Sequence, residues 1–287
     1  MKQILVADCG GTSCKWIYGN PANGAMPFTT EGFSAAASAA EAIDTSVDHA
    51  RQILAHGGAA PSEIAFFGAG CGTPQACQRV ETALAKVFPK ANISVRSDLD
   101  GAALATLGHG EGLACILGTG ANAGYYRGGH LISRIPPLGY ILGDEGSGAS
   151  IGRRILVKAL RGELREDTSE LFFKETGLSE AIAIEKVYRT SGANAFLGSL
   201  TRFIHAHMDI PELEEIITEA FGSFRAIFVE PYLSGRYSAV REGAPLRIGI
   251  AGSVGEVFAP LLRKALEGIE TTVTGSPAMA IASFLSK

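Results

Sequence analysis

The segment that decides the fold is residues 3–18, QILVADCGGTSCKWIY, in which two short apolar runs flank a glycine-rich turn. The first run, Gln3–Ala7, ends at Asp8–Thr12, and the second run, Cys14–Tyr18, follows at once. Two such runs joined by a short turn favour a β-hairpin over a strand that leads into a helix. Because the common dinucleotide and P-loop motifs join a strand to a helix, this hairpin indicates a different class of ligand-binding fold.

The hairpin pattern occurs twice in the chain. Residues 113–126, LACILGTGANAGYY, again place an apolar strand before Gly118-Thr119-Gly120 and a second strand-like run after it. A third apolar run, residues 246–251, ends at Gly252-Ser253. A strand, a glycine-rich turn and a strand that recur within one chain indicate a duplicated domain.

Helical periodicity alternates with strand-like runs along the chain. Further strands are expected at residues 64–67 and 93–95, and helices at residues 35–56, 74–88, 148–161, 166–176, 179–190, 194–207, 211–232 and 277–284. This alternation predicts an α/β layer architecture, and the stretch from 145 to 240 is expected to be mostly helical.

The composition is that of a globular chain without a global positive field. With 287 residues, of which 46% are hydrophobic, the chain is long enough for one or two domains. The net charge of −4 and the pI of about 5.9 argue against nucleic acid or an anionic membrane as partner. Bound phosphates would therefore have to be held by local loops.

Cysteine usage and hydropathy indicate the compartment. The chain has five cysteines, an odd number, and none has a histidine partner at zinc-ligand spacing. We find no secretory leader and no apolar run of about 20 residues, the length that spans a bilayer. We therefore expect reduced thiols, a cytoplasmic location and no membrane segment.

Two aspartates beside strand ends are candidate catalytic groups. Asp8 lies in the first hairpin, where a bare carboxylate repels phosphate unless Mg²⁺ lies between them. Asp98 follows the strand at 93–95, a position from which a carboxylate can accept a proton from a substrate hydroxyl. A helix N-cap is the alternative role for Asp98, and Asp100 is a rival for either function.

The glycine-rich turns are candidates for phosphate and substrate binding. Backbone N–H groups in such turns approach phosphate oxygens without obstruction by a Cβ atom, and Thr12, Ser13 and Thr119 add hydroxyl donors. Residues 143–148, GDEGSG, form an acidic turn ahead of a helix and contain more glycine than a helix cap requires. We expect this turn to line a cleft. The P-loop signature does not occur, and the glycines from 118 to 124 are spaced one residue too wide for the dinucleotide fingerprint.

At these motifs the sequence resembles the BadF/BadG-type ATPases of the actin/hexokinase superfamily, and within them the N-acetylglucosamine kinases. Residues 8–13, 118–120, 143–148 and 251–254 carry the resemblance, which extends over nearly the whole chain. The GDEGSG element is its most specific part, since the glycine turns are shared across the superfamily.

The resemblance implies the domain organisation. The expected fold is α/β, with two ribonuclease-H-like lobes of the actin/hexokinase type and a nucleotide cleft between them. The N-terminal lobe is expected over residues 1–107, with residues 276–287 packing back on it. The C-terminal lobe is expected over residues 108–275, enlarged by inserted helices. A homodimer formed through the helical lobe is also implied.

The resemblance also implies roles for individual residues. ATP and Mg²⁺ are the expected cofactors, Asp98 is the expected catalytic base and Asp8 the expected metal ligand. The expected nucleotide-binding residues are Asp8, Gly10, Gly11, Thr12, Ser13, Gly118, Thr119, Gly120, Gly252 and Ser253. The expected substrate-binding residues are Ser34, Asp98, Thr119 and Asp144.

Three residues depart from the family's pattern, and all three fall on the sugar side. The family's Gly-x-Asn-Pro sugar loop corresponds to residues 32–35, GFSA, so Ser34 replaces the asparagine. Leu138 stands where a tryptophan often precedes GDEGS, and Ala121 stands where a serine follows Gly-Thr-Gly. The sequence therefore predicts ATP binding more firmly than the identity of the sugar.

The predicted activity is ATP-dependent phosphorylation of an amino sugar, specifically N-acetylglucosamine to its 6-phosphate, with no nucleic-acid or membrane partner. One alternative is a non-catalytic protein that senses a sugar or nucleotide, against which the presence of both Asp8 and Asp98 argues. A second is an ATPase that activates an acyl-CoA dehydratase. That class needs cysteines for an iron–sulfur cluster, and no cysteine follows Cys115.

Overall fold

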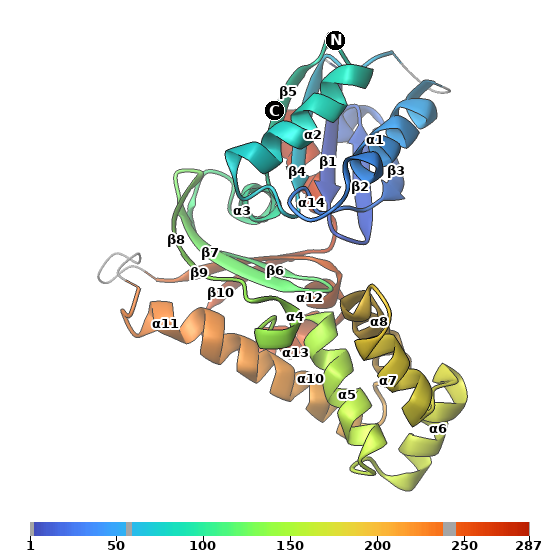
Figure 1. The fold of residues 1–287 in the computed structure, drawn as a ribbon. Coiled ribbons are helices and arrows are strands. Elements are labelled where there is room, and N and C mark those ends of the chain that lie inside the picture. The colour runs from blue at the N-terminus through green and yellow to red at the C-terminus, as the bar shows by residue number, and fades with distance from the viewer. Residues whose placement is uncertain (1–2, 56–58, 238–244, 287) are drawn as a thin grey trace. The chain divides into compact units, whose positions relative to one another are not determined.

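The computed structural model describes residues 3–55, 59–237 and 245–286 (Figure 1). The chain divides into two compact units, Met1–Gly110 together with Ser276–Lys287, and Glu111–Gly275. The change from the first unit to the second thus falls after Gly110, where the sequence predicts it after residue 107. Each unit contains a five-stranded mixed sheet with helices packed against it.

The sheet of the first unit has the order β3-β2-β1-β4-β5. Its strands are β1 (Ile4–Cys9), β2 (Ser13–Tyr18), β3 (Met26–Glu31), β4 (Glu63–Gly68) and β5 (Asn92–Ser97). The first three strands pair antiparallel, whereas β1, β4 and β5 run parallel. Its helices are the 3₁₀ turn η1 (Pro21–Asn23), α1 (Ala40–Ala55), α2 (Pro74–Val87), α3 (Asp98–Leu107) and α14 (Pro277–Leu285).

The central strands of the first unit are apolar on both faces because both faces are covered. Leu5, Ala7 and Cys9 face the core formed with α1 and α2, whereas Ile4 and Val6 face α14 and α3. Trp16 is fully buried in the first of these cores, as the sequence predicts, and its indole N–H donates to the Thr30 hydroxyl at 2.9 Å. This bond satisfies a donor that would otherwise be costly to bury.

The sheet of the second unit has the order β10-β9-β6-β7-β8. Its strands are β6 (Glu111–Leu117), β7 (Ala121–Arg127), β8 (His130–Ile135), β9 (Arg247–Ala251) and β10 (Glu270–Thr274). Its helices are α4 (Gly139–Leu142), α5 (Gly148–Leu160), α6 (Glu166–Thr176), α7 (Glu180–Tyr188), α8 (Ala193–Ser199), α9 (Thr201–Ala206), α10 (Pro211–Phe224), the π-turn η2 (Arg225–Val229), α11 (Glu230–Leu233), α12 (Ser253–Val257) and α13 (Ala259–Ala265).

The two sheets share one topology, which confirms the predicted duplication. Read from the opposite edge, the second order becomes β8-β7-β6-β9-β10, and each strand then corresponds to the strand five places earlier in the chain. The pairing directions agree as well, with two antiparallel pairs followed by two parallel pairs in each sheet. The units differ mainly in the long helical segment inserted between β8 and β9.

The observed helices depart from the predicted ranges at identifiable places. The helix predicted over 35–56 begins only at Ala40, and residue 56 lies outside the described residues. The range 194–207 forms two helices, and the range 211–232 is interrupted by the π-turn. Pro231 follows that turn closely; it has no backbone N–H to donate, which favours a local change of helical register.

The strands that the sequence analysis missed lie at sheet edges. β3, β8 and β10 carry the sequences MPFTTE, HLISRI and ETTVT, and each is only half covered by the core. Edge strands need no continuous apolar run, so their pattern is weaker than that of central strands. Within the described residues, no helix is both long enough and apolar enough to cross a bilayer.

Candidate active site

The first hairpin turn, between β1 and β2, presents open backbone. The Gly10 N–H donates to the Ser13 carbonyl at 2.9 Å, while Gly10, Gly11 and Thr12 are exposed. On the other side of the turn, a Cβ atom on Gly32 would lie only 2.2 Å from the backbone nitrogen of Ser13. The chain that follows β3 therefore runs directly against this turn, and glycine is required for that approach.

Asp8 lies at the end of β1 opposite Lys15 of β2 in the antiparallel register. Burial raises the pKa of the Asp8 carboxyl to about 6, and the positive charge of Lys15 opposes this rise. Sequence analysis missed Lys15. The signal was present, because residues that pair across a two-strand register point to the same face of the sheet.

Asp98 is the first residue of α3, directly after β5. Its carboxylate accepts a hydrogen bond from the Leu99 N–H at 2.8 Å. The N-cap is Ser97, whose hydroxyl accepts from the Asp100 N–H at 3.1 Å, and Asp100 completes a capping box. The alternative of Asp98 as an N-cap is therefore wrong, and Asp100, which also pairs with Arg96 at 3.4 Å, is committed to the helix end.

The surroundings of Asp98 favour its protonated form. Burial raises the pKa of Asp98 to about 7, the charges of Asp8 and Asp100 add to the rise, and the hydrogen bond from Leu99 opposes it. The side chain still has partial access to solvent. A carboxyl with a pKa near neutrality can take up and release a proton under ordinary conditions.

Ser34 joins the same edge of the first sheet. The Ala35 N–H donates to the Ala69 carbonyl at 2.9 Å, and a Cβ atom on Gly70, which has a φ of +79°, would lie 2.5 Å from the Ser34 hydroxyl oxygen. Burial raises the pKa of the next residue, Cys71, to about 12, and part of the rise comes from Asp98. Gly70, a residue that sequence analysis did not assign to the site, is thus required to seat Ser34.

These contacts define a first cluster at the carboxyl ends of β1, β4 and β5. Cys9, Gly68 and Ser97 are aligned across these parallel strands, so the residues that follow them emerge at one edge. The members of this cluster, all from the first unit, are Asp8, Gly10, Gly11, Thr12, Ser13, Lys15, Ser34 and Asp98.

The second hairpin turn, between β6 and β7, is held by the start of α5. The Gly148 N–H donates to the Gly118 carbonyl at 2.8 Å, and the Ala149 N–H donates to the Thr119 carbonyl at 3.0 Å. A Cβ atom on Gly198 of α8 would lie 3.3 Å from the Thr119 methyl group. Two helices thus fix the position of this turn.

Asp144 packs against the second turn. It is only 8% exposed, and its Oδ1 accepts a hydrogen bond from the Ala121 N–H at 3.2 Å. A Cβ atom on Gly120 would lie 3.0 Å from the Asp144 Oδ2. Burial raises the pKa of Asp144, the Ala121 N–H opposes the rise, and Glu145 adds to it. Asp144 also has a φ of 60°, a strained value for a residue with a side chain, and such strain is common at functional sites.

Gly252 and Ser253 complete a second cluster, in the second unit. Gly252 has a φ of 124°, donates its N–H to the Thr274 carbonyl at 2.9 Å, and could not carry a Cβ atom, which would lie 2.5 Å from the Leu117 carbonyl oxygen. Ser253 begins α12. The second cluster therefore contains Gly118, Thr119, Gly120, Asp144, Gly252 and Ser253, each predicted from the sequence.

Asn122, in β7 directly after Ala121, lies beside the second cluster, and sequence analysis missed it. Its Oδ1 is buried and has no hydrogen-bond partner. Buried acceptors are rarely left unpaired in folded proteins, so an acceptor without a partner beside a glycine-rich turn marks a position where a ligand could donate. Among the described residues, no group of three or more His, Cys, Asp or Glu side chains is arranged to hold a metal ion.

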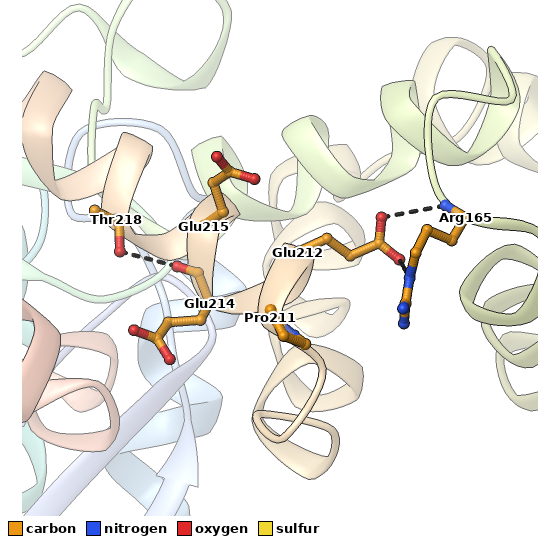
Figure 2. Close-up of a pocket in the computed structure, with 6 residues that line it drawn as sticks. All are labelled: Arg165, Pro211, Glu212, Glu214, Glu215 and Thr218. Atoms are coloured by element: carbon orange, nitrogen blue, oxygen red, sulfur yellow. Dashed lines mark hydrogen bonds and ion pairs between the residues drawn. The ribbon is translucent and has the colours of Figure 1, made fainter.

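A surface hollow in the second unit contains none of the predicted site residues (Figure 2). It is lined by Arg165, Pro211, Glu212, Glu214, Glu215 and Thr218. The Glu212 carboxylate accepts from the backbone N–H and the guanidinium of Arg165 at 3.2 and 3.4 Å. These bonds tie the start of α10 to the start of α6 and account for Glu212 structurally.

A crystal structure from Porphyromonas gingivalis, described as a "putative N-acetylglucosamine kinase", matches the chain with a TM-score of 0.86. The two sequences are 33% identical over 98% of each chain. The chain belongs to this sugar-kinase family. The predicted sugar kinase is thereby confirmed at the level of the family.

Two further solved structures show that the sugar-kinase fold extends to distant proteins. The "putative N-acetylglucosamine kinase" of Chromobacterium violaceum matches with 19% identity over 99% of each chain and a TM-score of 0.73. A ROK-family glucokinase of Streptomyces griseus, crystallised with glucose and AMPPNP, matches with 14% identity, 99% and 98% coverage and a TM-score of 0.55. The predicted actin/hexokinase-type fold is confirmed.

No family model matches the chain, and no curated protein matches it. The BadF/BadG assignment therefore stays a prediction.

Proposed function

We propose that this sugar kinase transfers the γ-phosphoryl group of ATP to a hydroxyl of an amino sugar, with N-acetylglucosamine and its 6-hydroxyl as the acceptor. The single observation that carries the proposal is Asp98. It is a carboxyl with a pKa near 7, placed at the same sheet edge as the open glycine turn and Asp8. The 33% identity to a protein described as an N-acetylglucosamine kinase supports the choice of sugar.

In the proposed reaction, Asp98 accepts the proton of the sugar hydroxyl. The hydroxyl oxygen forms a bond to the γ-phosphorus while the bond from that phosphorus to the β,γ-bridging oxygen breaks, and ADP leaves with the electron pair. The pKa of about 7 keeps a useful fraction of Asp98 deprotonated at neutral pH and still basic enough to take the proton.

The first hairpin would bind the phosphates. Its exposed N–H groups and the Thr12 hydroxyl are donors, and Lys15 adds a positive charge on the face that carries Asp8. Asp8 fits Mg²⁺ because this ion is commonly held by one or two carboxylates together with substrate phosphates. The ion, when bound, neutralises developing negative charge; Asp8 would hold it, and Asp98 remains free to act on the hydroxyl.

Each unit, taken by itself, presents polar groups that suit a sugar. Ser34 lies beside the Asp98 edge, and Asp144 offers the carboxylate oxygen that faces Gly120. The Asn122 Oδ1, which has no protein partner, is a ready acceptor for a substrate hydroxyl or amide N–H. A sugar that hydrogen-bonds these groups would be favoured over one that leaves them unpaired.

A panel assay tests this proposal. ADP release is measured with N-acetylglucosamine, glucosamine, N-acetylmannosamine and glucose, each with and without Mg²⁺. We expect N-acetylglucosamine to give the largest kcat/KM, with the product identified as the 6-phosphate by NMR. ATP binding without sugar-stimulated ADP release would instead favour the sensing protein or the dehydratase activator.

We also propose a homodimer formed through the helices of the second unit, as the family resemblance implies. Light scattering at several concentrations would return about twice the chain mass of 29.9 kDa. A constant monomer mass at all concentrations would contradict it.

A further inference from the structure

We propose that Arg79 is a positioning residue for sugar binding, because its guanidinium group fixes the loop that carries Ser34. The inference rests on the proposed function and deepens it by assigning a role to a residue outside both clusters. Arg79 lies in the middle of α2, and nothing in its local sequence marks it as part of a site.

The guanidinium group of Arg79 donates hydrogen bonds to two backbone carbonyls, and we call this pair of bonds the clamp. Arg79 Nη1 donates to the Ala35 carbonyl at 2.5 Å, and Nη2 donates to the Ser38 carbonyl at 2.6 Å. Ala35 is fully buried, and Arg79 and Ser38 are partly buried, so the bond to Ala35 is the better shielded from competing water. Bonds from a charged donor to shielded carbonyls are among the stronger hydrogen bonds in proteins.

The clamped loop is held at its start by buried Phe33, which stacks on Phe66, and by the Ala35 N–H, which donates to the Ala69 carbonyl; Arg79 adds the contact at Ser38. We call residues 32–38 the Ser34 loop; it has no regular secondary structure and joins β3 to α1. Within it, the Ser34 N–H donates to the Ser38 hydroxyl at 3.0 Å, and the Ser38 N–H donates to the Ser34 carbonyl at 2.8 Å. Arg79 holds Ser38 from outside, so it stabilises the closed turn that Ser34 itself helps to form.

The helix α2 also follows the segment that contacts the Ser34 hydroxyl from the other side. α2 begins at Pro74 and is capped by Thr73, shortly after Gly70, which lies against the Ser34 hydroxyl. The helix α2 therefore connects the segment at Gly70, which contacts Ser34, with Arg79, which binds the Ser34 loop. Loss of the clamp would free the Ser38 end of the loop and let the Ser34 hydroxyl move, while Gly32 stays bound to the hairpin turn through its N–H, which donates to the Thr12 carbonyl.

This geometry predicts a selective kinetic effect. Arg79→Lys keeps the charge but cannot span both carbonyls, because an ammonium group lacks the planar fork. We expect KM for the sugar to rise by about tenfold, the effect of losing one strong hydrogen bond. KM for ATP and kcat should stay within about twofold, since Arg79 touches neither phosphates nor reacting atoms.

Two further variants make the test specific. Ser38→Ala removes the hydroxyl that Ser34 uses and should raise KM for the sugar in the same direction, by about two- to fivefold. Lys86→Met is the matched control, because Lys86 lies on the same helix and forms a solvent-exposed ion pair with Asp44 at 3.1 Å. It should leave both KM values unchanged.

A second readout separates this inference from the proposed function. Backbone hydrogen exchange at residues 34–38 should be faster in Arg79→Lys than in the wild type and unchanged in Lys86→Met. If no sugar stimulates ADP release from the wild type, the proposed function fails, and exchange alone decides whether Arg79 holds the loop. Unchanged exchange, or equal increases of both KM values, would overturn the role proposed for Arg79.

Discussion

The two hairpins share an antiparallel strand–turn–strand arrangement but differ in electrostatic character. In register, the Asp8–Lys15 pair of the first hairpin corresponds to the Ile116–Asn122 pair of the second, because each is next to the last registered pair of its hairpin, Cys9–Cys14 and Leu117–Ala121. The first pair carries two charges and the second carries none. Duplication has kept the turn that presents backbone donors, while the charged groups occur on one copy alone.

This difference suggests a division of labour. Phosphoryl transfer requires a proton acceptor and an ion that screens negative charge, and the first cluster contains the carboxylates for both. In the second cluster, the carboxylate comes from the GDEGSG turn and is bound by the Ala121 N–H. That arrangement is suited to orienting a hydroxyl group rather than to holding an ion. Substitutions in the two clusters test this difference.

The largest effect is expected at Asp98. Asp98→Asn keeps the shape but cannot accept a proton, so kcat should fall by about 10²- to 10⁴-fold while ATP affinity is kept. Asp100→Asn, in the capping box, is the control and should retain most activity. In the wild type, kcat should rise with pH through about 7, as the carboxyl loses its proton. An unchanged kcat in Asp98→Asn would remove Asp98 from the mechanism.

The same substitution should alter the dependence of stability on pH. Because the pKa of Asp98 is raised to about 7, the folded state binds more protons than the unfolded state between about pH 4 and 7, so this group lowers the free energy of unfolding as pH rises. Asp98→Asn removes this decrease in the free energy of unfolding with rising pH. Its stability relative to the wild type should therefore be greater at pH 8 than at pH 5, by on the order of 1–2 kcal/mol.

Urea unfolding at the two pH values measures this difference. Asp144→Asn, in the second cluster, should change in the same direction, because burial also raises the pKa of Asp144. Asparagine tolerates the left-handed backbone at this position, so the substitution adds no conformational strain. A larger gain at pH 5 than at pH 8 for either variant would contradict the assigned direction.

Asp8→Asn tests whether metal binding belongs to the first hairpin. We expect the Mg²⁺ concentration for half-maximal rate to rise by about tenfold, because a neutral amide is a poorer ligand for a hard cation. Asp48→Asn, an exposed acid of the same unit that pairs with Arg51, is the control. A normal Mg²⁺ titration in Asp8→Asn would indicate that Asp8 has a structural role.

The smallest effect is expected for Lys15→Asn, which gives the first hairpin the side chain of the second. We expect KM for ATP to rise by about fivefold, since one positive charge near the phosphates is lost. KM for the sugar should change little. Lys15→Arg should restore most of the ATP affinity, whereas no change in KM for ATP with Lys15→Asn would place the phosphates away from this strand.

The central strands could be predicted from the sequence, whereas contacts between residues far apart in the chain could not. Continuous apolar runs predicted β1, β4, β6 and β9, because strands covered on both faces need apolar residues throughout. Asp8 could be predicted because it directly follows the apolar run of β1, and Asp98 because it follows the strand predicted at residues 93–95. The polar edge strands gave no comparable signal.

The residues that were missed depend on tertiary structure. Lys15 and Asn122 occur inside strands, where a polar side chain is most simply explained by exposure to solvent. Arg79 binds carbonyls more than forty residues away in the chain, a partner that no local pattern can reveal. The choice between Asp98 and Asp100 required the cap geometry, because both lie in the first turn of α3.

The second unit is an insertion within the first, and this order has a consequence for synthesis. The sheet of the first unit begins at Ile4, yet α14, which covers one of its faces, comes from Pro277–Leu285. On the ribosome, residues 111–275 can complete their own core while Ile4 and Val6 are covered by α3 but still lack α14. The nascent chain therefore leaves part of this apolar sheet face exposed until α14 is made, and this face is where we expect a chaperone to bind.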